Sequence, residues 1–295
     1  MMRKLLYWRI SLLLLSLFVG TIYLLTMAPG LTWAHRGADG GDLITAAATG
    51  GVPHPTGYPT YLLLARFFQF LPFGSLAFRT NLMSAVFATF TVLLVADLVR
   101  RSYAGPNWIG RIAGLLAGLG FGLSPLLWSQ ALITEVYTLH IFFVTILLWL
   151  FSLSEDDPFN HIWRDRLIGL LFGLALGNHL TTVFLLPALG GRTLMGSDEK
   201  KGIFPNLINQ WDWSGIARRF GWLFLGLSVY LIIPIRAHSA SPVNWGYPVD
   251  WNGFWWLVSG SMYQERIFHL GWQDILSRLR TWAGMLQSQF GVPGL

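Results

Sequence analysis

Residues 3–30 read RKLLYWRISLLLLSLFVGTIYLLTMAPG, and this stretch decides the class of fold. Three basic residues, Arg3, Lys4 and Arg9, precede eighteen consecutive residues without a charge, 10–27. A cleaved signal peptide has an apolar core of about 7–15 residues. The longer core predicts an uncleaved first membrane helix with its N-terminus in the cytoplasm, and a cleaved signal peptide is the alternative.

The composition of the whole chain agrees with a membrane protein. Of its 295 residues, 54% are hydrophobic and 12% are charged, whereas soluble domains are about 25% charged. Cysteine is absent from the sequence, which excludes disulfides and thiolate metal sites. The net charge of +6 comes without a long basic run, so we expect no nucleic-acid partner. These features predict an all-α, polytopic membrane bundle that forms a single domain over residues 1–295.

Six further apolar runs predict about seven spans in total, because a span needs about 20 apolar residues. They are residues 76–99, 108–128, 136–153, 167–176, 180–189 and 220–235. The fifth and sixth are short and are separated by GNH, so one broken helix is an alternative to the two tilted spans that we favour. The thirteen-residue run 59–71 is too short to cross and is expected to lie in the interface.

This order of spans also predicts the topology. The N-terminus and the loops at 100–111, 154–166 and 190–219 fall on one side, and together they hold thirteen of the twenty Lys and Arg residues. The positive-inside rule makes that side cytoplasmic. The first outer loop, 28–75, and the outer segment, 236–295, which contains no obvious span, then share the opposite face. The polar stretches SQALITEVYTL and GNHLTT reach the same face, so polar groups from distant parts of the chain are expected to converge there.

The first outer loop contains the densest polar cluster, WAHRGADGGDLITAAATGGVPHPTGYPTY, at 33–61. Residues 39–50 predict a short surface helix in which Asp39 is the N-cap and Asp42 completes a pattern like a capping box. Alternatively, one of the two carboxylates is a general base that deprotonates an acceptor hydroxyl. Three prolines stiffen the chain around His54. This stiffness favours a contact between His54 and a ligand such as a phosphate. The simpler interpretation is that the segment is only a rigid connector between interfacial helices.

Four more residues on the predicted outer face are candidates for the same site. Glu135 and His179 would line it, although Glu135 could instead cap the fourth span and His179 could satisfy a helix break. Arg79 and Arg236 could bind a phosphate, whose oxygen pairs suit guanidinium. For Arg236, snorkelling at the interface is the simpler interpretation. The shared location of these residues is stronger evidence than any one of them.

The distribution of charge separates three classes of function. A transporter or a flippase usually carries ionisable groups near the bilayer midplane, where they mark the transport pathway. The middles of the first, third, fourth and seventh predicted spans carry no charge, and the two halves show no repeat of the kind many transporters have. A membrane enzyme that works at the outer interface is therefore favoured over a transporter or flippase for a lipid-linked sugar and over a non-catalytic membrane scaffold.

The run DGGDLITAAATGGVPHPTGYPTYLLLARFFQFLPFG resembles a bacterial membrane family that is related to a eukaryotic transmembrane protein O-mannosyltransferase. The resemblance continues through RTNLMSAVFA, LSPLLWSQALITEVYTLH, GLALGNHLTTVFLLPAL and PIRAHSASPVNWGYP, which covers most of residues 30–250. It implies a GT-C glycosyltransferase fold in a bacterial inner membrane, with the active site on the outer face. Relatives of this kind are often longer, so the chain is expected to be an N-terminal portion of a larger architecture.

The same resemblance implies an inverting transfer of mannose or another hexose from a polyprenyl-phosphate donor to a hydroxyl of a protein, lipid or glycan. The catalytic carboxylate of such enzymes lies in the first outer loop, which makes Asp42 our preferred base and Asp39 its rival. The family often has Glu at the position of Asp42. His54, Arg79 and Arg236 would neutralise the leaving phosphate, and Glu135 and His179 would line the pocket. No cofactor is expected, with a divalent metal left open.

Overall fold

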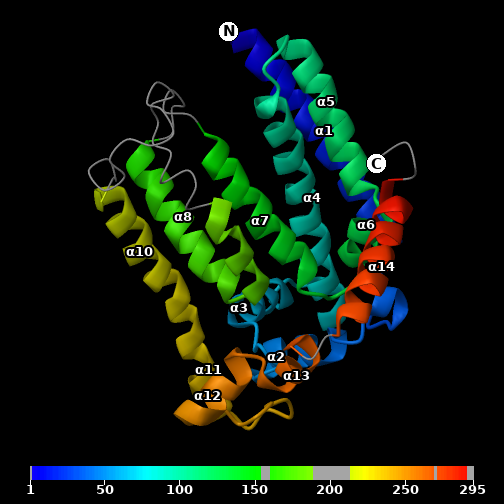
Figure 1. Ribbon diagram of the computed structural model, residues 1–295. Helices are drawn as coiled ribbons and strands as arrows, with labels where there is room; N and C mark the ends of the chain where they lie inside the picture. The colour runs from blue at the N-terminus through cyan, green and yellow to red at the C-terminus, as the bar shows by residue number, and fades with distance from the viewer. Residues whose placement is uncertain (1, 154–159, 189–212, 269–270, 291–295) are drawn as a thin grey trace.

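The computed structural model describes residues 2–153, 160–188, 213–268 and 271–290, which are almost entirely helical (Figure 1). Within this part of the chain, extended segments pair at a single bridge, Val52–Asn244. The all-α prediction is confirmed. The elements are α1 (Met2–Thr26), η1 (Ala34–Arg36), α2 (Gly40–Thr49), α3 (Pro59–Gln69), α4 (Leu76–Ser102), α5 (Asn107–Gly122), α6 (Pro125–Ala131), α7 (Tyr137–Ser152), α8 (His161–Leu176), η2 (Leu180–Leu185), α10 (Trp213–Leu227), η3 (Ser228–Leu231), α11 (Ile232–Ala237), α12 (Trp251–Val258), α13 (Ser261–Phe268) and α14 (Trp272–Phe290).

Three helical segments of the described chain are long and apolar enough to cross a membrane. They are Leu6–Thr26 in α1, Leu76–Ser102, which is α4, and Trp213–Ala237, which runs through α10, η3 and α11. They correspond to the first, second and last predicted spans. The fourth predicted span is α7, which is apolar but has only sixteen residues. The outer segment contributes α12 to α14, and none of these passes the same test, as its sequence predicted.

The third predicted span, 108–128, is not one straight helix. It is the pair α5 and α6, which meet at an angle of 63°. The cause is Pro125, whose ring disfavours a helical backbone at the preceding residue and which has no N–H to donate. Ser124 accordingly has an extended backbone, with φ −62° and ψ 136°. Together the two helices still pass the length and hydropathy test for one bent span, so the structure changes the straightness of the predicted span and leaves its location unchanged.

The short spans around GNH also differ from the prediction. The fifth, 167–176, is the second half of α8, which already begins at His161. The sixth begins as a 3₁₀ helix, η2, and its final residue lies outside the described part of the chain. Gly177–His179 separates the two elements, so the break itself was predicted correctly.

The connections sort to the two ends of the bundle in the predicted way (Figure 1). The start of α1 and the α4–α5 connection lie at the upper end of the view, whereas α2, α3, α12 and α13 gather at the lower end. The first outer loop and the segment after α11 therefore share one end of the molecule. Which end faces the outside stays a prediction from the positive-inside rule.

Small residues allow the long helices to approach each other closely. Gly110, Gly114, Gly118 and Gly122 form a buried stripe on α5. A Cβ on Gly114 would collide with the carbonyl oxygen of Ala96 in α4. The contact of α8 with α10 is built in the same way from glycines on both helices. Close approach through small residues is typical of helices that associate within a membrane, where apolar burial gives little driving force.

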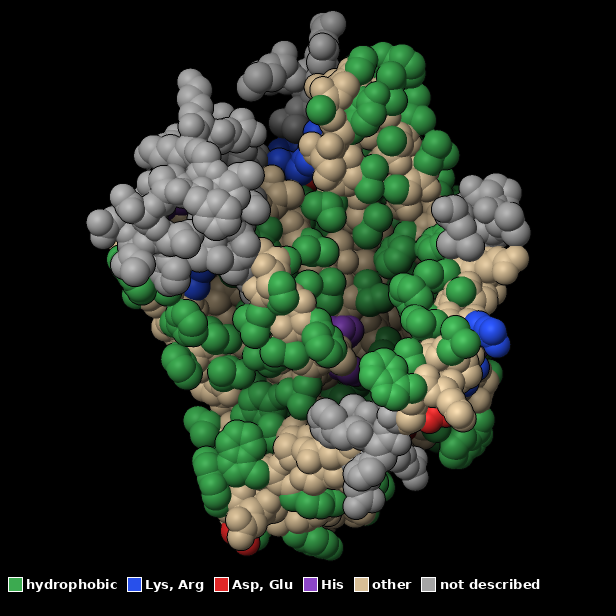
Figure 2. Space-filling view, in the orientation of Figure 1, with side chains coloured by type: hydrophobic (Ala, Val, Ile, Leu, Met, Phe, Trp, Pro, Cys, Tyr) green, Lys and Arg blue, Asp and Glu red, His purple; other side chains and the backbone are tan. Residues whose placement is uncertain are grey.

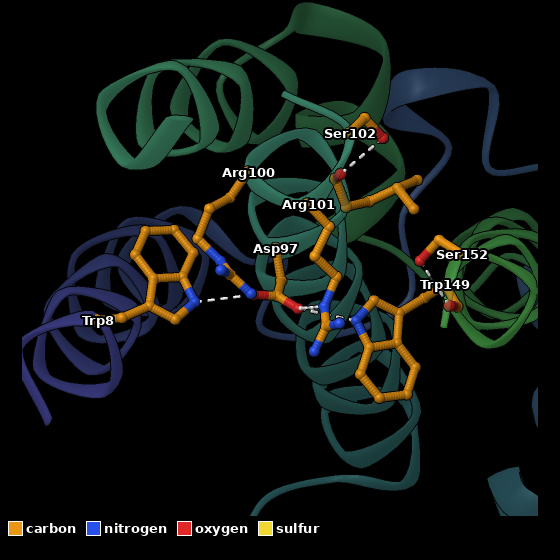
Figure 3. A network of polar contacts seen from close by, with 8 residues as sticks. Trp8, Asp97, Arg100, Arg101, Ser102, Trp149 and Ser152 are labelled. Carbon is orange, nitrogen blue, oxygen red and sulfur yellow. Dashed lines mark hydrogen bonds and ion pairs between the residues drawn. The ribbon is translucent and has the colours of Figure 1, made fainter. Parts of the chain in front are cut away.

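A half-buried polar contact fastens three helices at the upper end of the bundle (Figure 3). Asp97 of α4 accepts hydrogen bonds from the indoles of Trp8 in α1 and Trp149 in α7, at 2.8 and 2.9 Å. It also pairs with Arg100 and Arg101 of its own helix, each at 2.7 Å. Every partner of this carboxylate comes from the protein, so we interpret Asp97 as a structural tie between helices.

Candidate active site

The predicted surface helix of the first loop is α2, and its start places both aspartates. Asp39 is the residue at the N-cap position, but its backbone is helical (φ −89°, ψ −9°) and its side chain makes no capping hydrogen bond. A capping residue normally has an extended backbone and accepts from the first turn. The capping-box interpretation of Asp39 and Asp42 is therefore wrong, and both carboxylates are available for other contacts.

Asp42 is held by three N–H donors. Its Oδ2 accepts from the backbone N–H of His54 at 2.9 Å and lies 2.7 Å from the Nδ1 of the same residue. Its Oδ1 accepts from the indole of Trp245 at 3.1 Å. Both carboxylate oxygens are thus engaged by the protein itself.

His54 bridges the two aspartates. Its Nδ1 faces Asp42, and its Nε2 lies 3.6 Å from Oδ2 of Asp39. Burial lowers the pKa of His54, but the hydrogen bond to Asp42 and the charges of Asp39 and Asp42 outweigh it, so the pKa is raised above 6.5. Since both ring nitrogens face carboxylates, this geometry fits an ion pair better than the predicted contact with a phosphate.

The prolines around His54 set its position through the turn that follows. The N–H of Gly57, a residue with φ of +82°, donates to the carbonyl of His54 at 2.9 Å. Pro59 then starts α3, and the ring of Tyr58 lies edge-on to the His54 imidazole at 5.0 Å. Only 11% of the His54 side chain is exposed, so the loop presents a fixed imidazole to the helix that carries the aspartates.

The segment after α11 docks on the end of α2 and brings Trp245 to the site. Val52 donates to the carbonyl of Val243 at 2.9 Å, and Trp245 donates back to Val52 at 3.0 Å. Gly51 permits this approach, because a Cβ there would collide with Val243. Arg236 donates to backbone carbonyls at the end of α2, at 3.4 Å. It therefore ties α11 to the end of α2, a contact that neither the phosphate nor the snorkelling interpretation included.

Glu135 reaches the site from the short connection between α6 and α7. The residue is 2% exposed, and its Oε2 has no hydrogen-bond partner among the described residues. Burial, followed by the charge of Asp39, raises the pKa of Glu135 to about 7. The N-cap of α7 is Val136, without a side-chain hydrogen bond, so Glu135 does not cap the helix. Near neutral pH this carboxyl can hold or release a proton beside Asp39.

A cavity of about 510 Å³ opens beside these carboxyl groups. In Figure 2, histidine side chains are visible in a recess near the centre of this face. The apolar part of the cavity wall comes from α5, α6, α7 and α14, and the polar part comes from the first loop, α6, the α6–α7 connection and the start of α7. The polar lining includes His35, Arg36, Asp39, Gln130, Glu135, Tyr137 and His140. The space thus combines acidic, basic and apolar surfaces.

Two of the predicted residues lie apart from this group. The guanidinium of Arg79 donates to the backbone carbonyls of Gln69, Phe73 and Gly74, at 2.6 to 2.9 Å, and so closes the turn after α3. His179 accepts a hydrogen bond from the backbone N–H of Thr181, which satisfies the helix break as the simpler interpretation had it. The structure therefore brings Asp39, Asp42, His54 and Glu135 together, and it gives Arg79 and Arg236 backbone partners.

Three residues of the site were missed from the sequence. Trp245 lies 203 positions from Asp42, and nothing in its local pattern indicates that contact. His140 is three residues after Tyr137, so helical spacing could have placed both on the face that lines the cavity. Arg36 precedes Asp39 by three residues in the same loop and was the nearest basic side chain in the sequence.

The fold and the site define a helical membrane protein with an acidic, histidine-bridged centre at one end of the bundle. The chain belongs to the family described as the protein O-mannosyl-transferase TMEM260 N-terminal domain, whose model matches residues 39–201. These residues include the two aspartates, His54 and Glu135. The match supports the O-mannosyltransferase side of the predicted resemblance, and the bacterial origin stays a prediction.

Two curated relatives resemble most of the chain. The mouse protein O-mannosyl-transferase TMEM260 is 30% identical over 242 residues, which cover 80% of this chain and 32% of that protein. The Dictyostelium discoideum protein of the same name is 26% identical over 250 residues, which cover 79% and 28%. The chain thus spans about a third of the length of these relatives. No solved structure matches the chain.

Proposed function

We propose that this chain is the membrane-embedded catalytic part of a glycosyltransferase that transfers mannose, or another hexose, to an acceptor hydroxyl. The observation that carries the proposal is the position of Asp39, which lines the cavity beside the buried Glu135 and faces Nε2 of His54. Both relatives are named protein O-mannosyl-transferases, which supports mannose as the sugar and a protein as the acceptor.

Asp39 fits the role of general base better than our first preference, Asp42. Both oxygens of Asp42 already accept hydrogen bonds, from His54 and Trp245. The side chain of Asp39 is 44% exposed and borders the cavity, so an acceptor hydroxyl can reach it. In the reaction, Asp39 takes the hydroxyl proton while the oxygen attacks the anomeric carbon. The bond from that carbon to the phosphate oxygen breaks with inversion, and the phosphate leaves with the electron pair.

The donor would be a polyprenyl phosphate sugar, bound with its phosphate near the first loop and its chain against the apolar wall. Arg36 lines the cavity and is the cation we assign to the leaving phosphate, in place of Arg79 and Arg236. The apolar wall includes Phe121 of α5, Ile141 of α7 and Leu286 of α14. Such a lining suits a prenyl chain, whose burial is favourable in proportion to its apolar area.

The proposed function is tested with membranes that contain the full-length gene product. They are given a panel of radiolabelled polyprenyl-phosphate sugars, and transfer to the protein fraction is measured beside movement of the donor across vesicles. We expect transfer from the mannose donor and none from membranes with both aspartates changed to Asn. Movement of the donor without transfer would identify a flippase, and equal transfer by the double variant would refute the catalytic role of the first loop.

A further inference from the structure

A second polar cluster borders the cavity through His140. It consists of His140 on α7, Thr181 on η2 and His179 at the break between α8 and η2. The hydroxyl of Thr181 lies 2.7 Å from Nδ1 of His179 and 3.1 Å from Nε2 of His140, and the two imidazole rings are 4.7 Å apart. His140 also lines the cavity.

The hydrogen bonds in this cluster determine where its protons are. The backbone N–H of Thr181 donates to Nδ1 of His179, so this nitrogen is an acceptor. The Thr181 hydroxyl lies close to the same nitrogen, so its one O–H donates a hydrogen bond to Nδ1 of His179. The hydroxyl oxygen can then only accept from Nε2–H of His140. A neutral imidazole has one N–H, so Nδ1 of His140 carries a lone pair.

This lone pair has no partner in the part of the chain that the structure describes. Nδ1 of His140 is buried and makes no hydrogen bond to any of the described residues. A buried acceptor is costly unless a donor reaches it. The ring lines the cavity beside Glu135, where the reacting sugar would lie under the proposed function.

We propose that Nδ1 of His140 accepts a hydrogen bond from a hydroxyl of the donor sugar, and that Thr181 and His179 are positioning residues that fix its tautomer. This inference rests on the proposed function, because it names the donor that occupies the cavity. An acceptor nitrogen discriminates among the parts of that donor: an ionised phosphodiester and a prenyl chain have no O–H to offer, whereas a hexose has several. The hydroxyl of the acceptor substrate must reach Asp39, which removes its proton. The hydroxyl that donates to His140 is therefore one on the donor sugar.

Two pairs of matched variants test the proposal. Thr181→Val removes the hydroxyl with little change in size, and Thr181→Ser keeps it. His140→Asn places an amide oxygen near the position of Nδ1, whereas His140→Gln keeps a polar group only near Nε2. We measure equilibrium binding of radiolabelled polyprenyl-phosphate mannose to the protein in nanodiscs, and of donors that lack single sugar hydroxyls.

Thr181→Val and His140→Gln are expected to raise the Kd of the full donor about tenfold, as loss of one buried hydrogen bond does. Thr181→Ser and His140→Asn should stay within about twofold of the wild type, since each keeps the relevant group. One deoxy donor should bind the wild type as weakly as the full donor binds His140→Gln. In ¹⁵N spectra, the signals of His140 are identified by their loss in His140→Asn. Nδ1 of His140 should be unprotonated in the wild type. In Thr181→Val a fraction of the molecules should carry the proton on Nδ1.

The inference is overturned if the full donor binds all four variants equally well, if Nδ1 carries the proton in the wild type, or if only the KM for the acceptor changes. These results leave the transfer assay unaffected and are thus separate from the proposed function. Donor binding with the expected variant pattern but without transfer would refute the transferase while leaving the sugar contact intact. Absence of donor binding in the wild type would contradict both.

Discussion

At the scale of single residues, the site is a row of carboxyl groups joined by one imidazole. Asp42 orients His54, and His54 faces Asp39, so the two aspartates have different surroundings although they are three residues apart. The sequence could place both on one short helix and could place a stiffened histidine nearby. It could not distinguish their roles, because the indole that engages Asp42 comes from Trp245, after the last span.

Glu135 gives a prediction about pH and stability. Its pKa is about 7 in the folded protein and near 4.5 when it is not perturbed, so the folded state binds the proton more tightly. The contribution of this group is therefore fully present below about pH 4.5 and is lost as pH rises through about 7. As the pH rises from about 4.5 to about 7, we expect the wild type to lose about 3 kcal/mol of unfolding free energy relative to Glu135→Gln, which has no proton to release at this position.

The measurement for Glu135 is the midpoint of thermal unfolding in detergent, followed across this pH range for both proteins. His54 is present in both, so its own titration largely cancels in the difference. A constant difference between wild type and Glu135→Gln from pH 4.5 to 8 would show that Glu135 is not buried as the structure has it.

At the scale of the elements, apolar runs located most helices but not how they bend or what joins them. The first, second and last spans were predicted because the mean hydropathy of each run is high. The bend between α5 and α6 was missed because Pro125 lies inside an apolar run, where hydropathy outweighed the backbone rule. The docking of residues 241–245 on the end of α2 depends on Gly51, because a side chain there would collide with Val243. The sequence alone could not show this close approach, since the two segments are far apart along the chain.

The glycines between helices give a second prediction. A Cβ on Gly173 of α8 would collide with the backbone of α10 at Leu223, whereas a Cβ on Gly221 of α10 would meet open space. Gly173→Ala is therefore expected to destabilise the protein by about 1–3 kcal/mol through overpacking. Gly221→Ala, the matched control, should be neutral or stabilising by up to about 1 kcal/mol. Equal thermal midpoints in detergent for the two variants would show that α8 and α10 do not pack through these glycines.

At the scale of the whole molecule, one end collects the first loop and the segment after α11 (Figure 1). The cavity is lined by residues of that loop, and the Asp97 tie lies near the opposite end of α4 (Figure 3). Positive-inside counting predicts that the cavity end faces the outside. This arrangement could be predicted from the sequence, because consecutive spans place successive loops on alternating sides of the membrane. The cavity itself was not predictable, since its wall combines α5, α6, α7 and α14.

The topology can be tested directly because the sequence contains no cysteine. We expect Ala240→Cys, near the cavity end, to react with a membrane-impermeant maleimide in intact cells. Ser102→Cys, at the end of α4, should react only after the membrane is opened. Both positions are exposed in the structure. Labelling in the reverse order would place the site on the cytoplasmic side and would contradict the orientation.

We assign Asp39 as the general base and Asp42 as its indirect support. The most direct measurement is kcat for mannose transfer by Asp39→Asn and by Asp42→Asn, each beside the Kd of the donor. We predict that Asp39→Asn lowers kcat about 100-fold or more with an unchanged donor Kd, as loss of a general base does. Asp42→Asn should lower kcat by only about tenfold, because it acts through His54. Transfer by Asp39→Asn at the wild-type rate would contradict the account.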